Sequence, residues 1–132
     1  MILLPNKFPK AEHLCGEKRI ARLFTQGEAF IAYPFRVVYI VDAAEGAELA
    51  VNVMVSVPKK RFKRAVKRNR LKRLTREAYR LNKQLLIDCL ANKNVQLQIA
   101  FNYISNDELD FLTIDKKMKS AMGKLIDKLD KA

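Results

Sequence analysis

The stretch FKRAVKRNRLKRLTREAYRLNKQLLIDCL, residues 62–90, decides the fold. It contains no Gly or Pro and is rich in Leu, Arg, Lys and Ala, so it predicts one long helix. At about 100° per residue, one sector of that helix holds Leu71, Leu74, Ala78, Leu81 and Leu85. We expect this apolar sector to pack on a sheet and the opposite arc to face solvent.

Positive charge is concentrated in the same part of the chain. The 132-residue protein has a formal net charge of +12. Residues 59–83 contain 13 basic residues and one acid, Glu77, so this segment carries the whole imbalance and the rest of the chain nets zero. The arc opposite the apolar sector holds Arg68, Asn69, Lys72, Arg73, Arg76, Arg80 and Lys83. Clustered cations repel one another without an anionic partner, so this arc predicts nucleic-acid binding.

Two other interpretations of the basic helix are weaker. A solvated surface helix usually intersperses acids among its cations, whereas this segment has only Glu77. A helix that lies on a membrane usually carries a stronger apolar face with Trp or Phe, and this apolar sector has neither.

The segments before the basic helix predict one helix and two strands. Residues 17–26 place Ile20, Leu23 and Phe24 on one helical face, followed by Gly27. Residues 30–41 alternate as in a strand, and residues 49–57 are a second β-rich run that ends at Pro58. With a turn between them, the two runs are expected to form a hairpin.

The segments after the basic helix predict another strand and a last helix. Val95, Leu97 and Ile99 alternate with polar or small residues. Ser105 and Glu108 match a capping box that would open the final helix. Its expected core positions are Ile114, Met118, Ala121, Met122, Leu125 and Leu129. The predicted class is α+β, with helices packed on a small sheet of about four strands, and residues 1–132 are expected to form a single nucleic-acid-binding domain.

Composition also indicates what the protein does not need. Cys15 and Cys89 form no CxxC pair and His13 is the only histidine, so no zinc-type cluster is expected and the thiols are expected to be free. Met1 to Leu4 is too short for a signal-peptide core, and no window approaches a membrane span. We expect a cytoplasmic protein with no membrane partner and no small-molecule cofactor.

Three stretches resemble the ribonuclease P protein family of bacteria. RAVKRNRLKRLTR, residues 64–76, matches the family's signature of an Arg-Asn-Arg triplet followed by Lys-Arg and another Arg. VSVPKK, residues 55–60, resembles the strand end and Lys pair that lead into that helix, and LFTQG, residues 23–27, resembles the end of the first helix. The similarity runs from about Leu14 into the last helix.

The resemblance implies a role in tRNA maturation. Members of the family are the protein subunit of a ribonucleoprotein that removes the 5′ leader of precursor tRNA. The RNA subunit holds the catalytic Mg²⁺, and the protein alone is expected to be inactive. The expected partners are therefore the ribonuclease P RNA and the 5′ leader. The family also has a left-handed strand–helix–strand crossover, which breaks a general rule.

The family's binding residues carry over by position. The RNA-binding positions are Arg68, Asn69, Arg70, Lys72, Arg73 and Arg76 on the signature helix, Lys59 and Lys60 before it, and Ser56 on the adjacent strand. Phe24, Ile20 and Tyr39 are assigned to a leader-binding cleft, with Ile20 standing where relatives often have an aromatic residue. Considered as residues alone, Phe24 fits a core position equally well, and Tyr39 fits the core better. No catalytic residue is assigned.

Three other functions share part of this pattern. A ribosomal or other structured-RNA-binding protein would share the basic helix but not the spacing of the signature. A helix-turn-helix DNA binder needs two short helices around a tight turn, whereas this helix is long and follows a strand. A protein nuclease needs an acid–base constellation, which the basic segment lacks.

Overall fold

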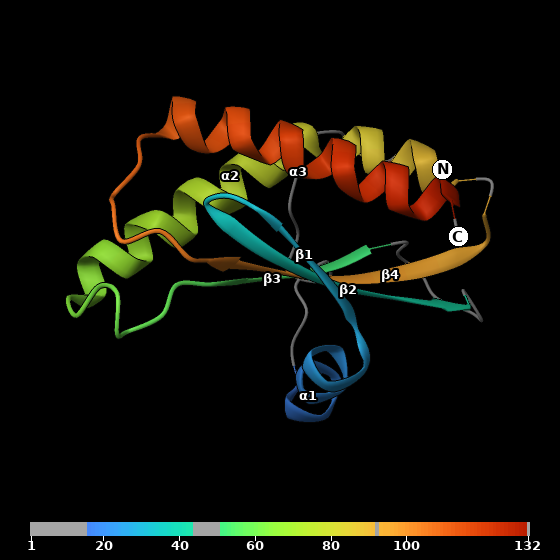
Figure 1. The fold of residues 1–132 in the computed structure, drawn as a ribbon, viewed down its shortest axis with the longest axis horizontal. Coiled ribbons are helices and arrows are strands. Elements are labelled where there is room, and N and C mark those ends of the chain that lie inside the picture. Colours follow the sequence, from blue (N-terminus) through green and yellow to red (C-terminus); the bar gives the residue numbers. More distant parts are fainter. Residues whose placement is uncertain (1–15, 44–50, 92, 132) are drawn as a thin grey trace.

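The computed structural model describes residues 16–43, 51–91 and 93–131. The elements are, in chain order, α1 (Glu17–Gln26), β1 (Glu28–Ala32), β2 (Phe35–Ala43), β3 (Val51–Ser56), α2 (Ala65–Leu90), β4 (Val95–Tyr103) and α3 (Phe111–Lys131). The strands form one sheet; α2 and α3 cover one face and α1 crosses the other (Figure 1). The predicted α+β class is confirmed, while the assignments of His13 and Cys15 lie outside the described residues.

The order of strands in the sheet is β1-β2-β4-β3, which the sequence did not predict. The expected hairpin between residues 30–41 and 49–57 is wrong, because β4 lies between β2 and β3 and pairs with both. Residues 30–41 belong instead to two strands, β1 and β2, which pair antiparallel on either side of Tyr33 and Pro34. Local alternation cannot reveal a pairing that is made by a strand so much later in the chain.

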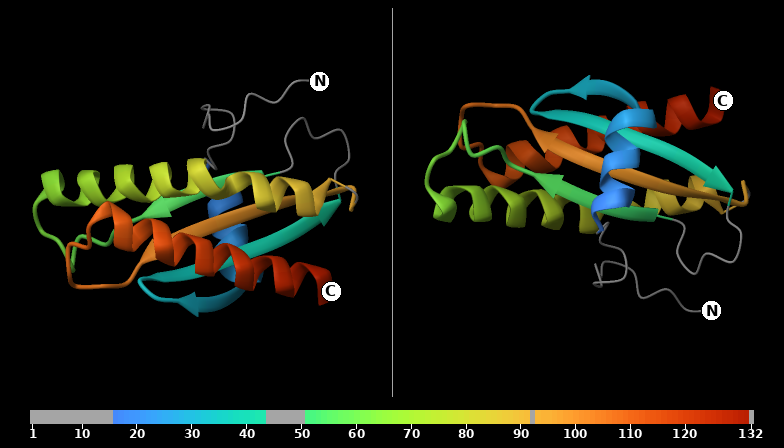
Figure 2. Two further views of the ribbon diagram at one scale, coloured as in Figure 1. Left: turned by 90° about the horizontal axis from the view of Figure 1, so that it is seen from above. Right: turned by 90° about the horizontal axis from the view of Figure 1, so that it is seen from below.

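The helix α2 connects two parallel neighbours, β3 and β4, and thus makes a crossover connection. In Figure 2 (left), the sheet is seen from the side that α2 and α3 cover, and β3 and β4 point the same way. With both strands turned to point upward, β4 lies to the left of β3. The crossover is therefore left-handed, as the resemblance implied, although about 98% of such connections are right-handed.

The buried face of α2 differs from the predicted sector. Leu71 and Ala78 are buried as expected, but the side chains of Leu81 and Leu85 are 43% and 62% exposed. The buried residues of α2 are Leu71, Thr75, Ala78, Tyr79, Asn82, Lys83, Leu86 and Leu90. Polar residues thus occupy part of the packed face. The prediction placed only apolar side chains on that face, so it assigned the wrong sector of the helix. Lys83 was predicted to lie on the exposed basic arc, but it is buried.

Two polar members of this face, Thr75 and Asn82, form hydrogen bonds inside the protein. The Thr75 hydroxyl donates to the carbonyl oxygen of Leu71 at 2.8 Å. The Asn82 amide donates at 2.7 Å to the carbonyl oxygen of Ala78 and at 2.7 Å to a carboxylate oxygen of Asp115 on α3. These bonds remove the main penalty for burying polar groups and fix α2 against α3.

The last helix begins later than the capping-box pattern predicts. The six expected core positions of α3 are all buried. The helix starts at Phe111, however, and Asp110 caps it by accepting the Thr113 amide hydrogen at 2.9 Å. The Ser105 hydroxyl instead accepts the Asp107 amide hydrogen at 3.0 Å, so Ser105 organises the preceding turn. No helix in the described ranges is long and apolar enough to cross a membrane.

On the other face of the sheet, α1 is held through one fully buried side chain. Leu23 is 0% exposed and packs with Val38 of β2 and Ala100 of β4. As predicted, the helix stops at Gly27, whose amide donates to the carbonyl oxygen of Leu23 at 2.9 Å. The chain then turns directly into β1, so Gly27 fixes where α1 leaves the sheet.

Candidate nucleic-acid interface

The cations of α2 lie on two flanks rather than on one arc. At about 100° per residue, Lys67, Arg70 and Leu74 lie on the flank that faces α3. There the Lys67 ammonium lies 3.2 Å from Glu108, and an Arg70 guanidinium nitrogen lies 3.9 Å from the same carboxylate. Arg70, a predicted RNA-binding residue, is therefore directed toward the loop before α3.

The opposite flank of α2 lies toward the free edge of β3. This outer flank, as we call it, carries Asn69, Lys72, Arg73 and Arg76. Within the described ranges, none of the four makes a side-chain hydrogen bond or ion pair, and Asn69 and Arg73 are exposed. Three cations and an amide therefore lie together on this flank without a side-chain partner among the described residues, an arrangement that suits phosphate binding.

Arg80 extends this flank but is already paired. Its guanidinium forms an ion pair with Glu77 one turn earlier, and its Nε donates to the same carboxylate at 3.1 Å. This hydrogen bond from Arg80 is the main reason why the pKa of Glu77 lies below its ordinary value. The only acid of the basic segment thus neutralises one cation at the end of the outer flank.

Arg68 has a structural role that the sequence did not reveal. Its Nη1 donates at 2.8 Å to the carbonyl oxygens of both Phe62 and Lys63. Phe62 is buried, with its ring centroid 5.9 Å from that of Tyr103. Arg68 is half-buried and connects the loop between β3 and α2 to the first turn of the helix.

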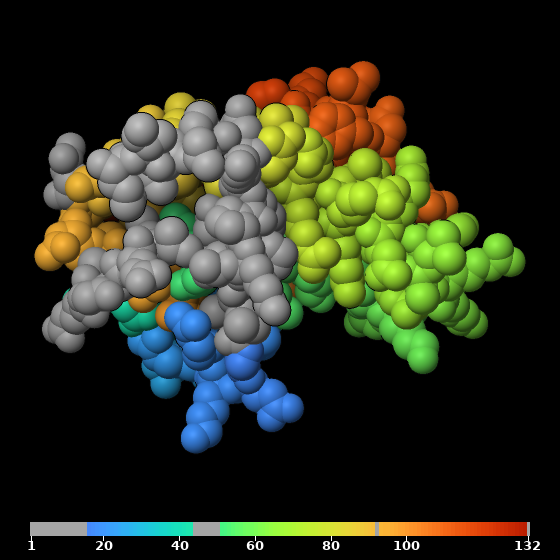
Figure 3. Space-filling view, turned by 180° about the vertical axis from the view of Figure 1, so that it is seen from behind, coloured from blue at the N-terminus to red at the C-terminus, as the bar shows by residue number. Residues whose placement is uncertain are grey.

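The same loop presents the predicted lysine pair. Lys59 and Lys60 are exposed and directly follow Pro58. Figure 3 shows this loop and the first half of α2, in green, gathered on one part of the surface. Lys59 and Lys60 therefore lie on the loop that leads from the end of β3 to the helix that carries the outer flank.

An ion pair fixes one side of α1 to the sheet. Arg22 donates to both carboxylate oxygens of Asp42 at 2.9 and 2.5 Å, and Gln98 donates to the same group at 3.2 Å. The hydrogen bond from Arg22 is the main cause that lowers the pKa of Asp42. A bidentate pair of this kind fixes orientation, so it sets the rotation of α1 about its axis.

The predicted residues Ile20 and Phe24 lie on the other side of α1. Relative to Leu23, which faces the sheet, helical geometry places Arg22 on one side and both Ile20 and Phe24 on the opposite side. The Phe24 side chain is 42% exposed, so it is not a core residue. Ile20 is half-buried against the Leu23 cluster.

Because Arg22 reaches Asp42 near one end of β2, Ile20 and Phe24 on the other side of α1 are directed toward the Arg36 end of β2. At that end a row of side chains runs straight across the sheet. Ser56 pairs with Asn102, Asn102 pairs with Arg36, and Arg36 pairs with Ile31. Paired residues share a face, and this face is the one that α1 crosses. We call Ser56, Asn102, Arg36 and Ile31 the cross-strand row. It joins the β3 edge, near the lysine pair, to the β1 edge.

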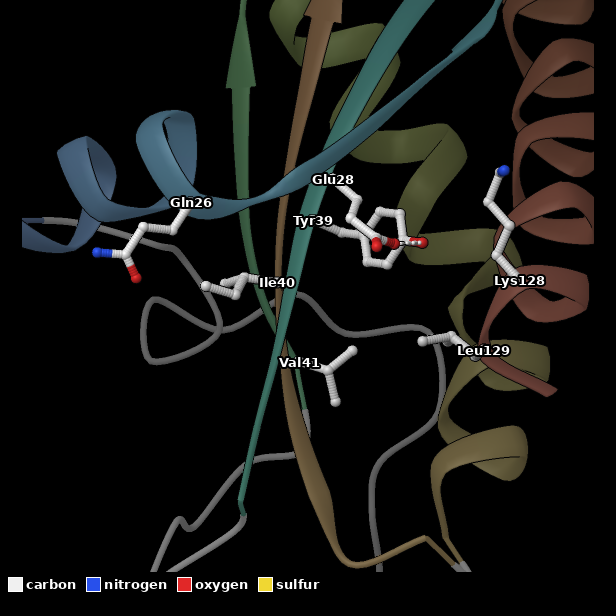
Figure 4. A pocket seen from close by; sticks show the side chains of 7 residues that line it. All are labelled: Gln26, Glu28, Tyr39, Ile40, Val41, Lys128 and Leu129. Atoms are coloured by element: carbon white, nitrogen blue, oxygen red, sulfur yellow. Dashed lines mark hydrogen bonds between the residues drawn. The ribbon is translucent and has the colours of Figure 1, made fainter. Parts of the chain in front are cut away.

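Tyr39 does not belong to this site. It lies among the residues packed under α2 and α3, is 6% exposed, and points toward α3 while Ile40 points toward α1 (Figure 4). Its hydroxyl donates to Glu28 at 2.7 Å, and burial raises its pKa to about 12. The alternation of β2 places Tyr39 with Phe35 and Val37, on the face opposite α1. Its expected position in a cleft with Phe24 and Ile20 is therefore wrong.

Three members of the cross-strand row were not anticipated from the sequence. Arg36 and Ile31 are exposed and Asn102 is half-buried. Arg36 and Asn102 lie two residues from Val38 and Ala100, which pack against α1, so alternation carries a signal for them, whereas Ile31 is placed on this face by its pairing with Arg36. The signal becomes usable only when the pairing of β2 with β4 is known.

The described residues contain no group of three or more His, Cys, Asp or Glu side chains that could hold a metal ion. Cys89 is half-buried, and burial is the main reason its pKa lies above the ordinary value.

Comparisons with known proteins identify the family to which the chain is related. A family model described as Ribonuclease P matches residues 8–126. The chain is 46% identical over 113 residues to the ribonuclease P protein component of Porphyromonas gingivalis, covering 86% of this chain and 82% of the relative. It is 36% identical over 104 residues to that of Chlorobaculum tepidum, covering 74% and 68%.

Solved structures show the same fold. The RNase P protein from Thermotoga maritima superposes with a TM-score of 0.67 at 20% identity, covering 86% of this chain and 96% of that one. The protein from Staphylococcus aureus gives 0.66 at 18% identity, covering 88% and 96%. The chain therefore belongs to the ribonuclease P protein family, as a subunit of the enzyme that processes the 5′ end of tRNA.

Proposed function

We propose that the chain binds the ribonuclease P RNA through the outer flank of α2 and holds the single-stranded 5′ leader of precursor tRNA along the cross-strand row. The observation that carries the proposal is a set of groups on the outer flank that have no side-chain partner in the described ranges: Asn69, Lys72, Arg73 and Arg76. Arginine and lysine neutralise phosphates and release counterions, which supplies most of the affinity for structured RNA. Lys59 and Lys60, on the loop before α2, add two exposed cations.

The cross-strand row has the chemistry that a single strand requires. Phe24 offers an exposed ring on which a base can stack. Asn102 and Ser56 offer hydrogen-bonding groups for base edges or 2′-hydroxyls, and Arg36 offers a cation for a phosphate. These groups are held in place by a sheet and a helix, so their side chains lose little conformational entropy when RNA binds.

In this proposal the protein contributes binding and the RNA contributes chemistry. The Mg²⁺ ions of the reaction are held by the RNA subunit, where they would activate the attacking water and stabilise the leaving oxygen. The protein's cations lower the repulsion between two RNA molecules, so its contribution should be largest when Mg²⁺ is scarce.

We expect the purified protein to cleave no precursor tRNA and to stimulate cleavage by a ribonuclease P RNA at low Mg²⁺. The measurement is single-turnover cleavage of precursor tRNA by protein alone, RNA alone and the reconstituted complex, over a Mg²⁺ series. Cleavage by rigorously RNA-free protein would contradict the assignment of catalysis to the RNA. A protein that binds the RNA without stimulating cleavage would favour a general structured-RNA binder instead.

A second test concerns the leader. We expect Phe24→Ala to weaken binding of precursor tRNA to the reconstituted complex by about 1–3 kcal/mol, because a leader base can no longer stack on the ring. Binding of mature tRNA should be unchanged. The 42% exposure of Phe24 predicts only a modest fall in melting temperature. Leu112→Ala, which truncates a 77% exposed side chain on α3, is the matched control. Equally weakened binding of both tRNAs would remove Phe24 from the binding site.

A further inference from the structure

At the β1 edge the cross-strand row meets a second group of cations. Ile31, the last member of the row, is 53% exposed on the outermost strand. It also lines a surface pocket together with Phe30, Lys124, Asp127, Lys128 and Lys131. Ile31 faces the side of α1, whereas its neighbour Phe30 packs against the core under α3. The pocket therefore wraps around the sheet edge and joins the two faces.

The three lysines of this pocket come from one side of α3. Lys124, Lys128 and Lys131 lie on successive turns, and Figure 2 shows α3 running beside the β1 edge in both views. Lys124 reaches the edge itself, since its ammonium donates to the carbonyl oxygen of Ile31 at 3.3 Å. Lys128 lies 5.5 Å from the centroid of the Phe30 ring.

These lysines form no salt bridge with another described residue. In the part of the chain that the structure describes, none of the three forms an ion pair, whereas Lys119 on the same helix pairs with Asp115 at 2.6 Å. Asp127 is the one acid that lines the pocket, so the pocket retains a net positive charge. Because the cross-strand row ends at this pocket, a polyanion bound along the row can extend into the pocket.

We propose that Lys124, Lys128 and Lys131 bind the phosphate backbone of the distal 5′ leader where it leaves the cross-strand row at the β1 edge. The inference rests on the proposed function, because it takes the leader to lie along that row. The row spans three strand spacings, roughly 14 Å, so only a few nucleotides fit along it. Any longer leader must continue past Ile31, and the α3 lysines are the cations at that exit.

The distinguishing property of this site is its dependence on leader length. Wild-type complex, reconstituted with ribonuclease P RNA, is titrated with precursor tRNAs that carry unstructured leaders of about 2, 4, 8 and 12 nucleotides, within the range of single-strand site sizes. We expect affinity to rise with the first few nucleotides and to rise again once the leader passes the β1 edge. In the variant Lys124→Gln/Lys128→Gln/Lys131→Gln the second rise should disappear, with about a 10-fold weaker binding of the longest leader.

Salt dependence and a matched variant complete the test. For the longest leader, the slope of log affinity against log salt should become shallower by about 0.7 for each leader phosphate that the variant no longer neutralises. The control is Lys93→Gln/Lys116→Gln/Lys119→Gln, which removes the same charge from lysines that do not line the β1-edge pocket and should leave both rises intact. As a measurement independent of variants, a photoreactive nucleotide near the 5′ end of the longest leader should crosslink to α3.

The possible outcomes separate this site from the proposed function. If the wild-type complex shows no dependence on leader length, both the leader-binding role and this inference fail. If the variant keeps the second rise, or if the crosslink falls elsewhere, the α3 site is wrong while the leader-binding role stands. Equal weakening for every leader, including leaderless tRNA, would place the lysines against another part of the RNA and would also overturn the inference.

Discussion

The triple variant Lys72→Ala/Arg73→Ala/Arg76→Ala is expected to bind ribonuclease P RNA roughly 100-fold more weakly at physiological salt, because three phosphates are left without a cation. These side chains have no internal partner among the described residues, so their truncation removes little from the fold. The free energy of unfolding should change by less than about 0.5 kcal/mol per site. Filter binding or calorimetry over a salt series measures the first effect, and thermal unfolding measures the second.

The salt series decides whether the outer flank has been assigned correctly. Each phosphate that is no longer neutralised should reduce the log–log slope by about 0.7–0.9, so the triple variant should be shallower by roughly 2–3. Lys93→Ala/Lys116→Ala/Lys119→Ala is the charge-matched control and should keep the wild-type slope. Arg68 is kept in both variants. Its substitution would break the hydrogen bonds to Phe62 and Lys63, so a loss of structure could not be separated from a loss of binding. A wild-type slope in the outer-flank variant would show that RNA binds elsewhere.

Gly27→Ala is expected to destabilise the protein, because Gly27 is packed closely against two backbone carbonyl groups. An added Cβ would collide with the carbonyl oxygen of Leu23 and lie 2.9 Å from that of Tyr39. Both are backbone atoms, so the end of α1 must shift away from β2. Overpacking of this kind costs about 1–3 kcal/mol or more. Chemical denaturation should detect this as a lower midpoint of unfolding.

The chain offers a matched control for this substitution at Gly123. A Cβ there would meet nothing within 4 Å, and Gly123 lies inside α3. Gly123→Ala should therefore stabilise the protein by about 0.5–1 kcal/mol through helix propensity. Because Gly27 sets the position of α1, its substitution should also weaken leader binding while leaving RNA binding by α2 intact. Similar stability for the two variants would mean that α1 is not packed closely against the sheet.

Local features of the fold were predictable from the sequence. The bounds of α1, the existence of α2 and the buried side of α3 follow from helical spacing, the stop at Gly27 and an uninterrupted run of helix formers. The outer flank was also largely predictable, because charge segregation on a helix depends only on spacing along the chain.

Features set by distant contacts were not predictable. The insertion of β4 between β2 and β3 depends on pairings made across the whole length of α2. Without the strand order, the sequence does not show that a row is formed by Arg36, Asn102 and Ile31. It also does not show that Tyr39 lies on the face of the sheet opposite α1. The packed face of α2 was misjudged for a different reason: Thr75 and Asn82 are polar, yet hydrogen bonds to α2 carbonyls and to Asp115 make them suitable for burial.

The position of β4 in the middle of the sheet has a consequence for how the protein is made. Chain order places α2 before β4, while β4 supplies Asn102 and is the only strand that joins β3 to β2 within the described part of the chain. During synthesis, the helix with the outer flank therefore emerges before the cross-strand row can form. A nascent chain can already attract its RNA through α2 while its sheet is still two separate parts. The complete site forms only when β4 joins the sheet, so RNA that binds the complete site more tightly than α2 alone would favour the folded state by mass action and assist the folding of its own protein.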